Sequence, residues 1–356
     1  MKFFENAEVK AVSSEDYNYW FSKVDGTFVR WGKTLEDDPT VAPICEILDI
    51  EVTTACSGVK NVGSKVDSPC AWCYKANTKN GKNMSFDTFK SIIDKLFIKI
   101  DGKKCIFTCQ LAFGVDSHAT SNPDLFKMMA YCREIGIIPN ITVADISDET
   151  ADKLVKYCGA VSVSRYANKD ICYDSVKKLT DRGLKQTNIH VLAASQSKDW
   201  IYETFQDVKT DPRLKDLNAI VLLSLKKRGR GVGFDKLTEQ EFSEIVNFAL
   251  DNDIKLGLDS CSCARLFKAT EYHKNFEMIQ TTGEPCESTL FSQFCDVDGK
   301  FHPCSFCNCD GIDGTKIDNF VKDVWMHPNT VAFREKLLKT TERNKFGCRE
   351  CPIYDI

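Results

Sequence analysis

The chain has 356 residues, with 47 Lys and Arg against 51 Asp and Glu, which gives a formal net charge of −4. This length is enough for one large domain or two. The acidic balance argues against a sequence-independent hold on nucleic acid, because such binding needs surplus positive charge.

No stretch of the chain has the character of a membrane segment or an export signal. The N-terminal residues include Glu5 and Glu8, where a secretory signal would be apolar. The longest apolar run, Ala219–Leu223, is far shorter than the roughly 20 residues that cross a bilayer. We therefore expect a soluble, cytoplasmic protein with no membrane partner.

Between residues 44 and 225, short apolar runs alternate with amphipathic helical patterns. The predicted strands are Ile47–Val52, Cys105–Leu111, Ile137–Val143, Ala160–Val163, Asn188–Ala193 and Ala219–Leu225. Helical spacing marks Phe86–Leu96 and Leu125–Cys132, and Ser85 and Ser147 occupy N-cap positions. Six βα repeats predict right-handed crossovers and a parallel sheet. The span is shorter than the roughly 250 residues of a closed eight-fold barrel. The expected fold is therefore α/β, a partial (β/α)6 TIM-type barrel with its chemistry at the C-terminal ends of the strands.

The flanking segments divide the rest of the chain. Residues 1–44 suggest a β-rich extension, because Thr27–Trp31 alternates after an Asp-Gly turn. Residues 45–258 form the predicted barrel, which ends with a helix over Glu239–Leu250 and a strand over Lys255–Leu258. Residues 259–285 form a bridging segment, and residues 286–356 a small Cys-rich C-terminal domain.

Cysteine content points to metal chemistry. The chain has 18 cysteines, nine between Cys45 and Cys172 and nine between Cys261 and Cys351. Without an export signal, clustered cysteines indicate metal or thiol chemistry rather than disulfides. Six of them lie in strand or helix patterns and are expected to be structural: Cys45, Cys105, Cys109, Cys132, Cys158 and Cys172.

Cys56, Cys70 and Cys73 follow the first predicted strand. Three thiolates can hold three irons of a [4Fe-4S] cluster and leave the fourth iron open. The alternative is a zinc knuckle, which requires a fourth Cys or His nearby, and the nearest histidine in sequence is His118.

This arrangement resembles the radical S-adenosylmethionine (SAM) superfamily, whose pattern is Cys-x3-Cys-x2-Cys ahead of a six-fold βα repeat. Here the first gap is 13 residues long, Ser57 to Pro69, an insertion of ten. The resemblance implies a [4Fe-4S] cluster bound by three cysteines, and SAM as the second cofactor.

The resemblance also implies a set of SAM-binding residues. Gly114, Val115 and Asp116 are similar to the family's Gly-Gly-Glu segment, with the Asp116 carboxylate on the methionyl amine. Ser164 and Arg165 match positions that contact the ribose or carboxylate of SAM, although polar residues are also ordinary at a strand end. Trp72 would shield the cluster and pack near the adenine.

The C-terminal cysteines are similar to the opening of SPASM and Twitch domains, which carry auxiliary clusters. Cys286 and Cys304 flank an Asp-Gly turn, and a terminal Cys-x2-Cys, Cys348 and Cys351, would complete four ligands. We expect one auxiliary [4Fe-4S] cluster on these four residues, with a structural zinc site as the alternative. Two further cysteines could substitute as ligands or support a second cluster: Cys307 and Cys309.

Two features remain open. Cys261 and Cys263 follow a strand-like run, and their spacing would put both thiols on one face if the strand continued. They are candidate catalytic hydrogen-atom donors, cluster ligands or inert core residues. The basic run 226–231 is either a solvated loop or a hold on an acidic peptide or on the SAM carboxylate.

The resemblance implies an enzyme that generates a 5′-deoxyadenosyl radical to modify a peptide or protein, as a maturase of ribosomally made peptides does. Epimerisation, crosslinking, excision and side-chain oxidation are all compatible. The implied partners are a reductant such as flavodoxin or ferredoxin and a separate leader-binding protein. The alternatives are a radical SAM enzyme acting on RNA or a nucleotide, and a non-enzymatic zinc-binding interaction protein.

Overall fold

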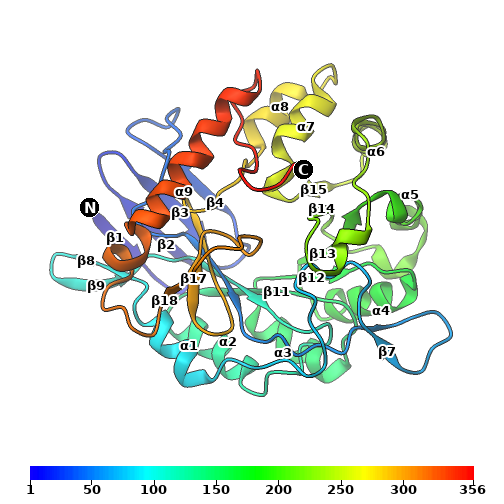
Figure 1. Cartoon of the computed structure of the whole chain (residues 1–356), viewed down its shortest axis with the longest axis horizontal. Helices are drawn as coiled ribbons and strands as arrows, with labels where there is room; N and C mark the ends of the chain where they lie inside the picture. The colour runs from blue at the N-terminus through cyan, green and yellow to red at the C-terminus, as the bar shows by residue number, and fades with distance from the viewer.

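One large mixed sheet dominates the computed structural model, which describes all 356 residues (Figure 1). Eight of its strands are parallel, and seven of these lie side by side in chain order. The seven are β5 (Ile47–Glu51), β10 (Gln110–Gly114), β11 (Ile138–Val143), β12 (Ala160–Ser164), β13 (Gln186–Ala193), β14 (Ala219–Ser224) and β15 (Leu256–Leu258). The mixed α/β class with a large parallel sheet is confirmed, and the parallel run is one strand longer than a six-fold repeat.

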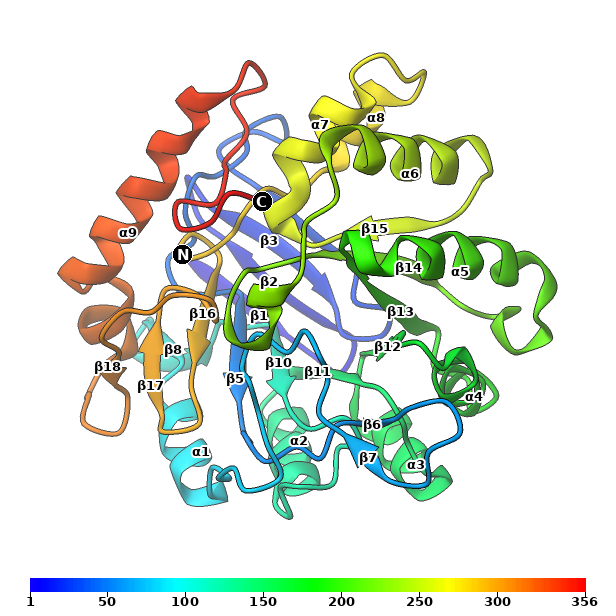
Figure 2. The ribbon, with the colours of Figure 1, turned by 45° about the vertical axis from the view of Figure 1, so that its right-hand side comes forward.

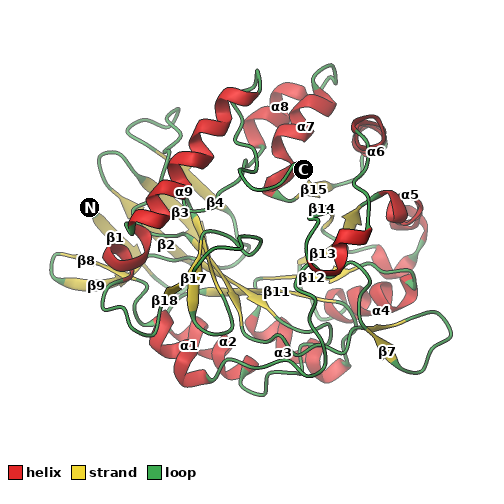
Figure 3. Ribbon diagram, in the orientation of Figure 1, coloured by secondary structure: helices red, strands yellow, loops and turns green.

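Six helices follow the parallel strands and cover the outer side of the sheet (Figure 3). They are α1 (Phe86–Ile93), α2 (Leu125–Glu134), α3 (Asp148–Tyr157), α4 (Lys169–Thr180), α5 (Lys198–Thr210) and α6 (Glu239–Asp251). Ser85 and Ser147 cap α1 and α3 as predicted, since each side chain accepts a hydrogen bond from a backbone N–H of the first turn. No helix in the structure is both long enough and apolar enough to cross a membrane.

The second predicted strand is wrong in its bounds. Residues 97–106 instead form a hairpin of β8 (Phe97–Ile100) and β9 (Lys103–Ile106), and β10 begins only at Gln110. The cause is the Asp101-Gly102 turn, in which both residues have positive φ and reverse the chain.

The N-terminal residues form a separate four-stranded antiparallel sheet. Its strands are β1 (Lys2–Glu5), β2 (Val9–Ser13), β3 (Asn18–Ser22) and β4 (Phe28–Trp31). Lys10 Nζ and the Tyr19 hydroxyl donate to the carbonyls of Thr108 and Phe107, at 2.9 Å each. Because these carbonyls immediately precede β10, this sheet covers the end of the barrel opposite the C-terminal ends of the strands.

The C-terminal residues extend the main sheet instead of forming a sheet of their own (Figure 2). After α7 (Cys263–Thr270) and α8 (Phe276–Thr282), β16 (Ser292–Cys295) pairs with β5 in parallel. The antiparallel strands β17 (Lys300–His302) and β18 (Ile312–Asp313) follow, and then helix α9 (Pro328–Leu338).

The two faces of the parallel strands differ in chemistry. The outer face is apolar and buried in the core, for example at Leu48, Ile50 and Leu222. The opposite face, called the inner face here, carries small and polar residues that keep partial solvent access: Asp49, Ala112, Asn140, Thr142, Ser164, Asn188 and His190. Closed barrels fill this space with branched apolar side chains. The inner face is therefore an open polar surface.

Because the two faces differ in burial, truncating two neighbouring side chains of β14 should lower the free energy of unfolding by different amounts. Leu222→Ala removes a fully buried side chain and should lower the free energy of unfolding by about 2–5 kcal/mol. Leu223→Ala, on the half-buried inner face, should cost about 1 kcal/mol or less. Urea unfolding followed by circular dichroism measures both, and equal costs would contradict an open inner face.

Candidate functional site

The first three predicted cysteines lie together beyond the C-terminal end of β5. The Cys56 N–H donates to the Thr78 carbonyl at 2.8 Å, and the Cys73 N–H to the Cys70 carbonyl at 3.3 Å. Cys56 and Cys73 are both near enough to Cys70 to influence its ionisation. Parallel strands thus bring the three thiols to the edge where the sequence places the chemistry.

The surroundings of Cys70 tune its thiol. Burial raises the pKa of Cys70, whereas a hydrogen bond from Tyr166 and the nearby Arg230 guanidinium oppose this rise. Tyr166 was not among the sequence candidates, and Arg230 was considered only as part of the basic run 226–231. Tyr166 directly follows the predicted pair Ser164 and Arg165, but nothing in the local sequence marks its phenol as a partner of Cys70.

The insertion between Cys56 and Cys70 folds back on itself. It forms a short hairpin of β6 (Val59–Lys60) and β7 (Asp67–Ser68). Gly58 has φ +93°, and a Cβ there would lie 1.8 Å from the Ser68 carbonyl oxygen. Only glycine permits this approach, which closes the hairpin base so that the cysteines on either side can meet.

His118 links the hairpin base to the barrel. Its Nε2 lies 2.9 Å from Asp67 Oδ2, and its Nδ1 lies 2.8 Å from the Asp145 carbonyl. Because both neighbours accept, the two hydrogen bonds form together only when both ring nitrogens carry a proton. Burial opposes the charged ring, yet these two acceptors raise the pKa of His118 above its ordinary value.

Trp72 belongs to a group of aromatic side chains beside the first cysteines. Its ring stacks on Tyr166 at 5.3 Å between centroids and also contacts Trp200 and Phe234. The Ser164 hydroxyl hydrogen-bonds to Tyr166. Trp72 therefore lies within an aromatic group next to the first cysteine loop, and its shielding role stays a prediction.

Arg165 is 2% exposed, and its Nη2 pairs with the Glu203 carboxylate at 2.5 Å. Its Nε and Nη1 have no hydrogen-bond partner. A buried guanidinium with two free donors is suited to bind an anion.

The Gly114–Asp116 segment follows β10, and Gly114 is exposed. The Asp116 carboxylate does not point outward. It accepts hydrogen bonds from the backbone N–H groups of His118, Thr120 and Ser121. In this geometry Asp116 orders its own loop, and the groups left to contact a ligand are those of Gly114 and Val115.

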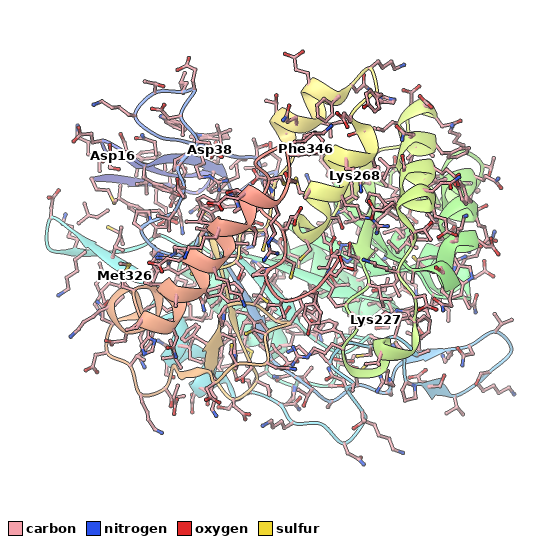
Figure 4. All side chains as sticks on the ribbon, turned by 45° about the horizontal axis from the view of Figure 1, so that its top comes forward. Asp16, Asp38, Lys227, Lys268, Met326 and Phe346 are labelled. Carbon is pink, nitrogen blue, oxygen red and sulfur yellow. The ribbon has the colours of Figure 1, made fainter.

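The basic run after β14 is not simply a solvated loop. Arg230 donates to the Cys70 carbonyl at 2.8 Å and to the Asn77 carbonyl at 3.2 Å, and its N–H donates to the Cys73 carbonyl at 3.0 Å. Arg228 donates to the Ser305 carbonyl at 2.7 Å, and Lys226 is buried against Asp259. Lys227 alone points outward, as Figure 4 shows. The run ties the first cysteine loop to the C-terminal segment.

Four C-terminal cysteines form a second group. The Cys261 and Cys286 thiols contact each other, and Cys304 and Cys351 are close neighbours of both. Backbone N–H groups two or three residues further along the chain donate to three of the sulfurs, those of Cys286, Cys304 and Cys351. Such N–H···S bonds favour thiolates and tune bound clusters.

Cys348 lies elsewhere. It contacts Cys263, and both thiols are 3% exposed within a small apolar cluster with Phe267 and Ile279. The expected strand does not continue past Leu258; a 3₁₀ turn over Ser260–Ser262 and helix α7 replace it. Cys261 and Cys263 therefore face different surroundings, and Cys261 occupies the place expected of Cys348.

Cys307 and Cys309 contact each other at the surface, beside Cys304. Nowhere in the chain do three His, Cys, Asp or Glu side chains close around one point as a single metal ion requires. A cubane distributes its ligands over four irons, which sets them further apart.

Comparisons with known proteins give a distant likeness in structure. No protein-family model matches the chain, and no curated protein matches it. Among solved structures it is similar to coproporphyrinogen III oxidase (HemN) from Escherichia coli, described as a radical SAM enzyme. The identity is 13% and the TM-score 0.39, over 59% of this chain and 54% of that one. The chain thus spans about half the length of that structure.

Gly229, in the basic run, and Gly233, two residues after the end of that run, predict opposite outcomes for the same change. Gly229 has φ +56°, and a Cβ there would lie 2.4 Å from the Tyr74 carbonyl oxygen. Gly229→Ala should therefore push the run off the cysteine loop and destabilise the fold by at least about 1–2 kcal/mol. Gly233→Ala is the matched control, because nothing lies within 4 Å of its Cβ position. Thermal unfolding and alkylation rates of Cys70 and Cys73 measure the effect, and equal behaviour of the two variants would contradict the packing.

Proposed function

We propose that the chain is a radical SAM enzyme that modifies a peptide or protein substrate. The observation that supports this best is the placement of Cys56, Cys70 and Cys73. Their thiols gather at the C-terminal ends of parallel strands, beside an open polar inner face. This is where βα folds place their chemistry.

The donor set fits a [4Fe-4S] cluster. Three thiols can hold three irons, and the fourth iron stays free for SAM. When bound, the cluster supplies one-electron cleavage of SAM to methionine and a 5′-deoxyadenosyl radical. The Tyr166 hydroxyl and the Arg230 guanidinium favour the Cys70 thiolate, which is the form that ligates iron.

Other residues would bind and orient SAM. The two unpartnered nitrogens of Arg165 would bind its carboxylate, and the backbone of Gly114 and Val115 would face its amine. Trp72 and its aromatic neighbours would exclude water from the cluster. Asp116 would contribute indirectly, by holding the loop that carries these backbone groups.

The second cysteine group would hold one auxiliary [4Fe-4S] cluster. Its ligands would be Cys261, Cys286, Cys304 and Cys351, since the thiols lie together and three receive backbone N–H donors. Because Cys261 would be a ligand of this cluster, a role for its thiol as a hydrogen-atom donor is the less favoured alternative. An auxiliary cluster favours a peptide or protein substrate. The partners would then be a reductant such as flavodoxin or ferredoxin and a separate leader-binding protein.

Iron content tests both sites. Anaerobic reconstitution should give about eight irons per chain and a brown protein, because each site would hold a four-iron cluster. Replacing Cys56, Cys70 and Cys73 together by Ala should remove about four irons and abolish 5′-deoxyadenosine formation from SAM. A colourless protein that binds zinc would refute the enzyme assignment, and so would SAM cleavage by the triple variant.

Single serine substitutions test which cysteines ligate the auxiliary cluster. Cys261→Ser and Cys351→Ser should each lose up to about four irons while substrate-free SAM cleavage persists. Cys348→Ser is the matched control, because Cys348 packs against Cys263 in the apolar cluster. It should keep the iron of wild type. Loss of iron from Cys348→Ser but not from Cys261→Ser would instead favour the ligand set expected from the sequence.

A further inference from the structure

Asp49 is the carboxylate that the proposed chemistry leaves unused. It lies in the middle of β5, between Leu48 and Ile50, whose side chains are buried in the core on the outer face. Successive strand residues alternate between faces, so the Asp49 side chain lies on the inner face. Its neighbours in register are Ala112 on β10 and Phe294 on β16.

Asp49 makes no hydrogen bond and no ion pair in the structure. Burial is the only influence on its ionisation, and it raises the pKa of Asp49 to about 6. At neutral pH the group is therefore still largely charged. Asp49 keeps partial solvent access but is surrounded by protein. A charge that has lost part of its hydration and has no partner is unfavourable, and such a group is a candidate for ligand binding or a reaction.

The cations near the inner face are already matched with other carboxylates. Lys75 Nζ lies 3.3 Å from Glu51 Oε1, Lys226 pairs with Asp259, and Arg165 pairs with Glu203. His190 adds no charge, because burial lowers its pKa to about 4. The inner face thus carries one uncompensated negative charge at neutral pH, that of Asp49.

The surroundings of Asp49 suit a cation. The Lys75 ammonium lies 4.3 Å from the centroid of the Phe294 ring, the neighbour of Asp49 on the same face. The protein therefore already holds one ammonium between a carboxylate and an aromatic ring at this place. On the other side Ala112 pairs with Asn140, and both of these small or polar residues keep partial solvent access.

We propose that Asp49 binds a positively charged group of the substrate, an ammonium or a guanidinium, at the inner face. This inference rests on the proposed function and names the substrate class of that site: a peptide or protein with a basic side chain or a free amine at the residue that enters the barrel. Asp49 is a binding residue here, and the cysteine site is separate from it.

Stability gives the first test, and it requires no substrate. The carboxylate of Asp49 destabilises the folded chain wherever it is charged, because its folded pKa lies above the ordinary value near 3.9. The penalty is fully present above pH 6 and disappears below about pH 4. Reconstituted Asp49→Asn should therefore melt higher than wild type, with a larger gain at pH 8 than at pH 5. Other groups near Asp49 that titrate or carry charge are Glu51, Lys75, Tyr74 and Cys45, and all are unchanged in the variant.

The control for this test is Asp16→Asn, at an exposed bend residue that likewise makes no ion pair. It should leave the melting temperature unchanged at both pH values. A fall in the melting temperature of Asp49→Asn at pH 8 would overturn the inference, because it would reveal a structural partner for the carboxylate.

Binding gives the second test. The probes are the tripeptides Gly-Arg-Gly and Gly-Lys-Gly, with the neutral Gly-citrulline-Gly as reference, titrated calorimetrically into reconstituted chain at low salt. Wild type should prefer the cationic peptides, and Asp49→Asn should bind them at least tenfold more weakly. No preference in wild type, or an unchanged preference in the variant, overturns the inference.

SAM itself carries an amine, so its binding is measured on the same variant by equilibrium dialysis. Asp49→Asn should bind SAM as wild type does. A loss of SAM binding would overturn the assignment to substrate. A chain that contains no iron yet prefers cationic peptides through Asp49 would refute the proposed function and leave the cation site standing.

Discussion

The parallel pairing of β5 with both β10 and β16 is the constraint on which the rest of the site depends. β5 continues into Cys56, and β16 continues through its hairpin with β17 to Cys304. One strand therefore sets the position of both cysteine groups. A one-residue slip between β5 and β16 would reverse the faces of β16 and move Phe294 away from Asp49. Such a register is well specified here because Leu48 and Ile50 are fully buried on the outer face.

The basic run after β14 holds the two cysteine groups next to each other. Arg230 and Arg228 donate mainly to backbone carbonyls, which are neutral acceptors and remain available whatever the ionisation of nearby thiols. The two contacts reach opposite partners, the Cys70–Asn77 loop and the segment at Ser305. Tyr74 and Phe306 complete the junction, with ring centroids 4.6 Å apart. The cysteine groups are thus joined by packing across the mouth of the barrel, and Gly229 is required where the run approaches the Cys73 and Tyr74 carbonyls.

Much of the fold could be predicted from periodicity. Alternation of apolar residues predicts the strands from β11 to β15, and capping chemistry predicts the N-caps Ser85 and Ser147. The common edge of parallel strands predicts that Cys56, Cys70 and Cys73 lie together. The members of the second cysteine group could not be predicted, because sequence spacing alone does not show whether Cys348 or Cys261 belongs to it. The two cysteines differ in their tertiary contacts. Cys348 packs in an apolar cluster beside Phe267, whereas Cys261 contacts Cys286. The hydrogen bonds of Arg230 could not be predicted from the sequence either, because its partners are carbonyl groups more than 150 residues away along the chain.

Two charged groups of opposite sign with free bonding capacity mark the two ends of the open region. Arg165, at the C-terminal end of β12, pairs with Glu203 but has two buried nitrogens without partners, and Asp49, lower on β5, has a carboxylate without one. Both cost stability in the free chain, because the two guanidinium nitrogens lack acceptors and the carboxylate has lost part of its hydration. Opposite charges that could reach each other would pair; here β10 and β11 stand between β5 and β12 in the sheet and keep the two apart. Two bound groups, an anion at Arg165 and a cation at Asp49, would relieve both costs at once. Under the proposed function, the cofactor carboxylate would lie at the strand ends beside the first cysteines and the substrate at the deeper inner face, so that the reacting centre would lie between the two.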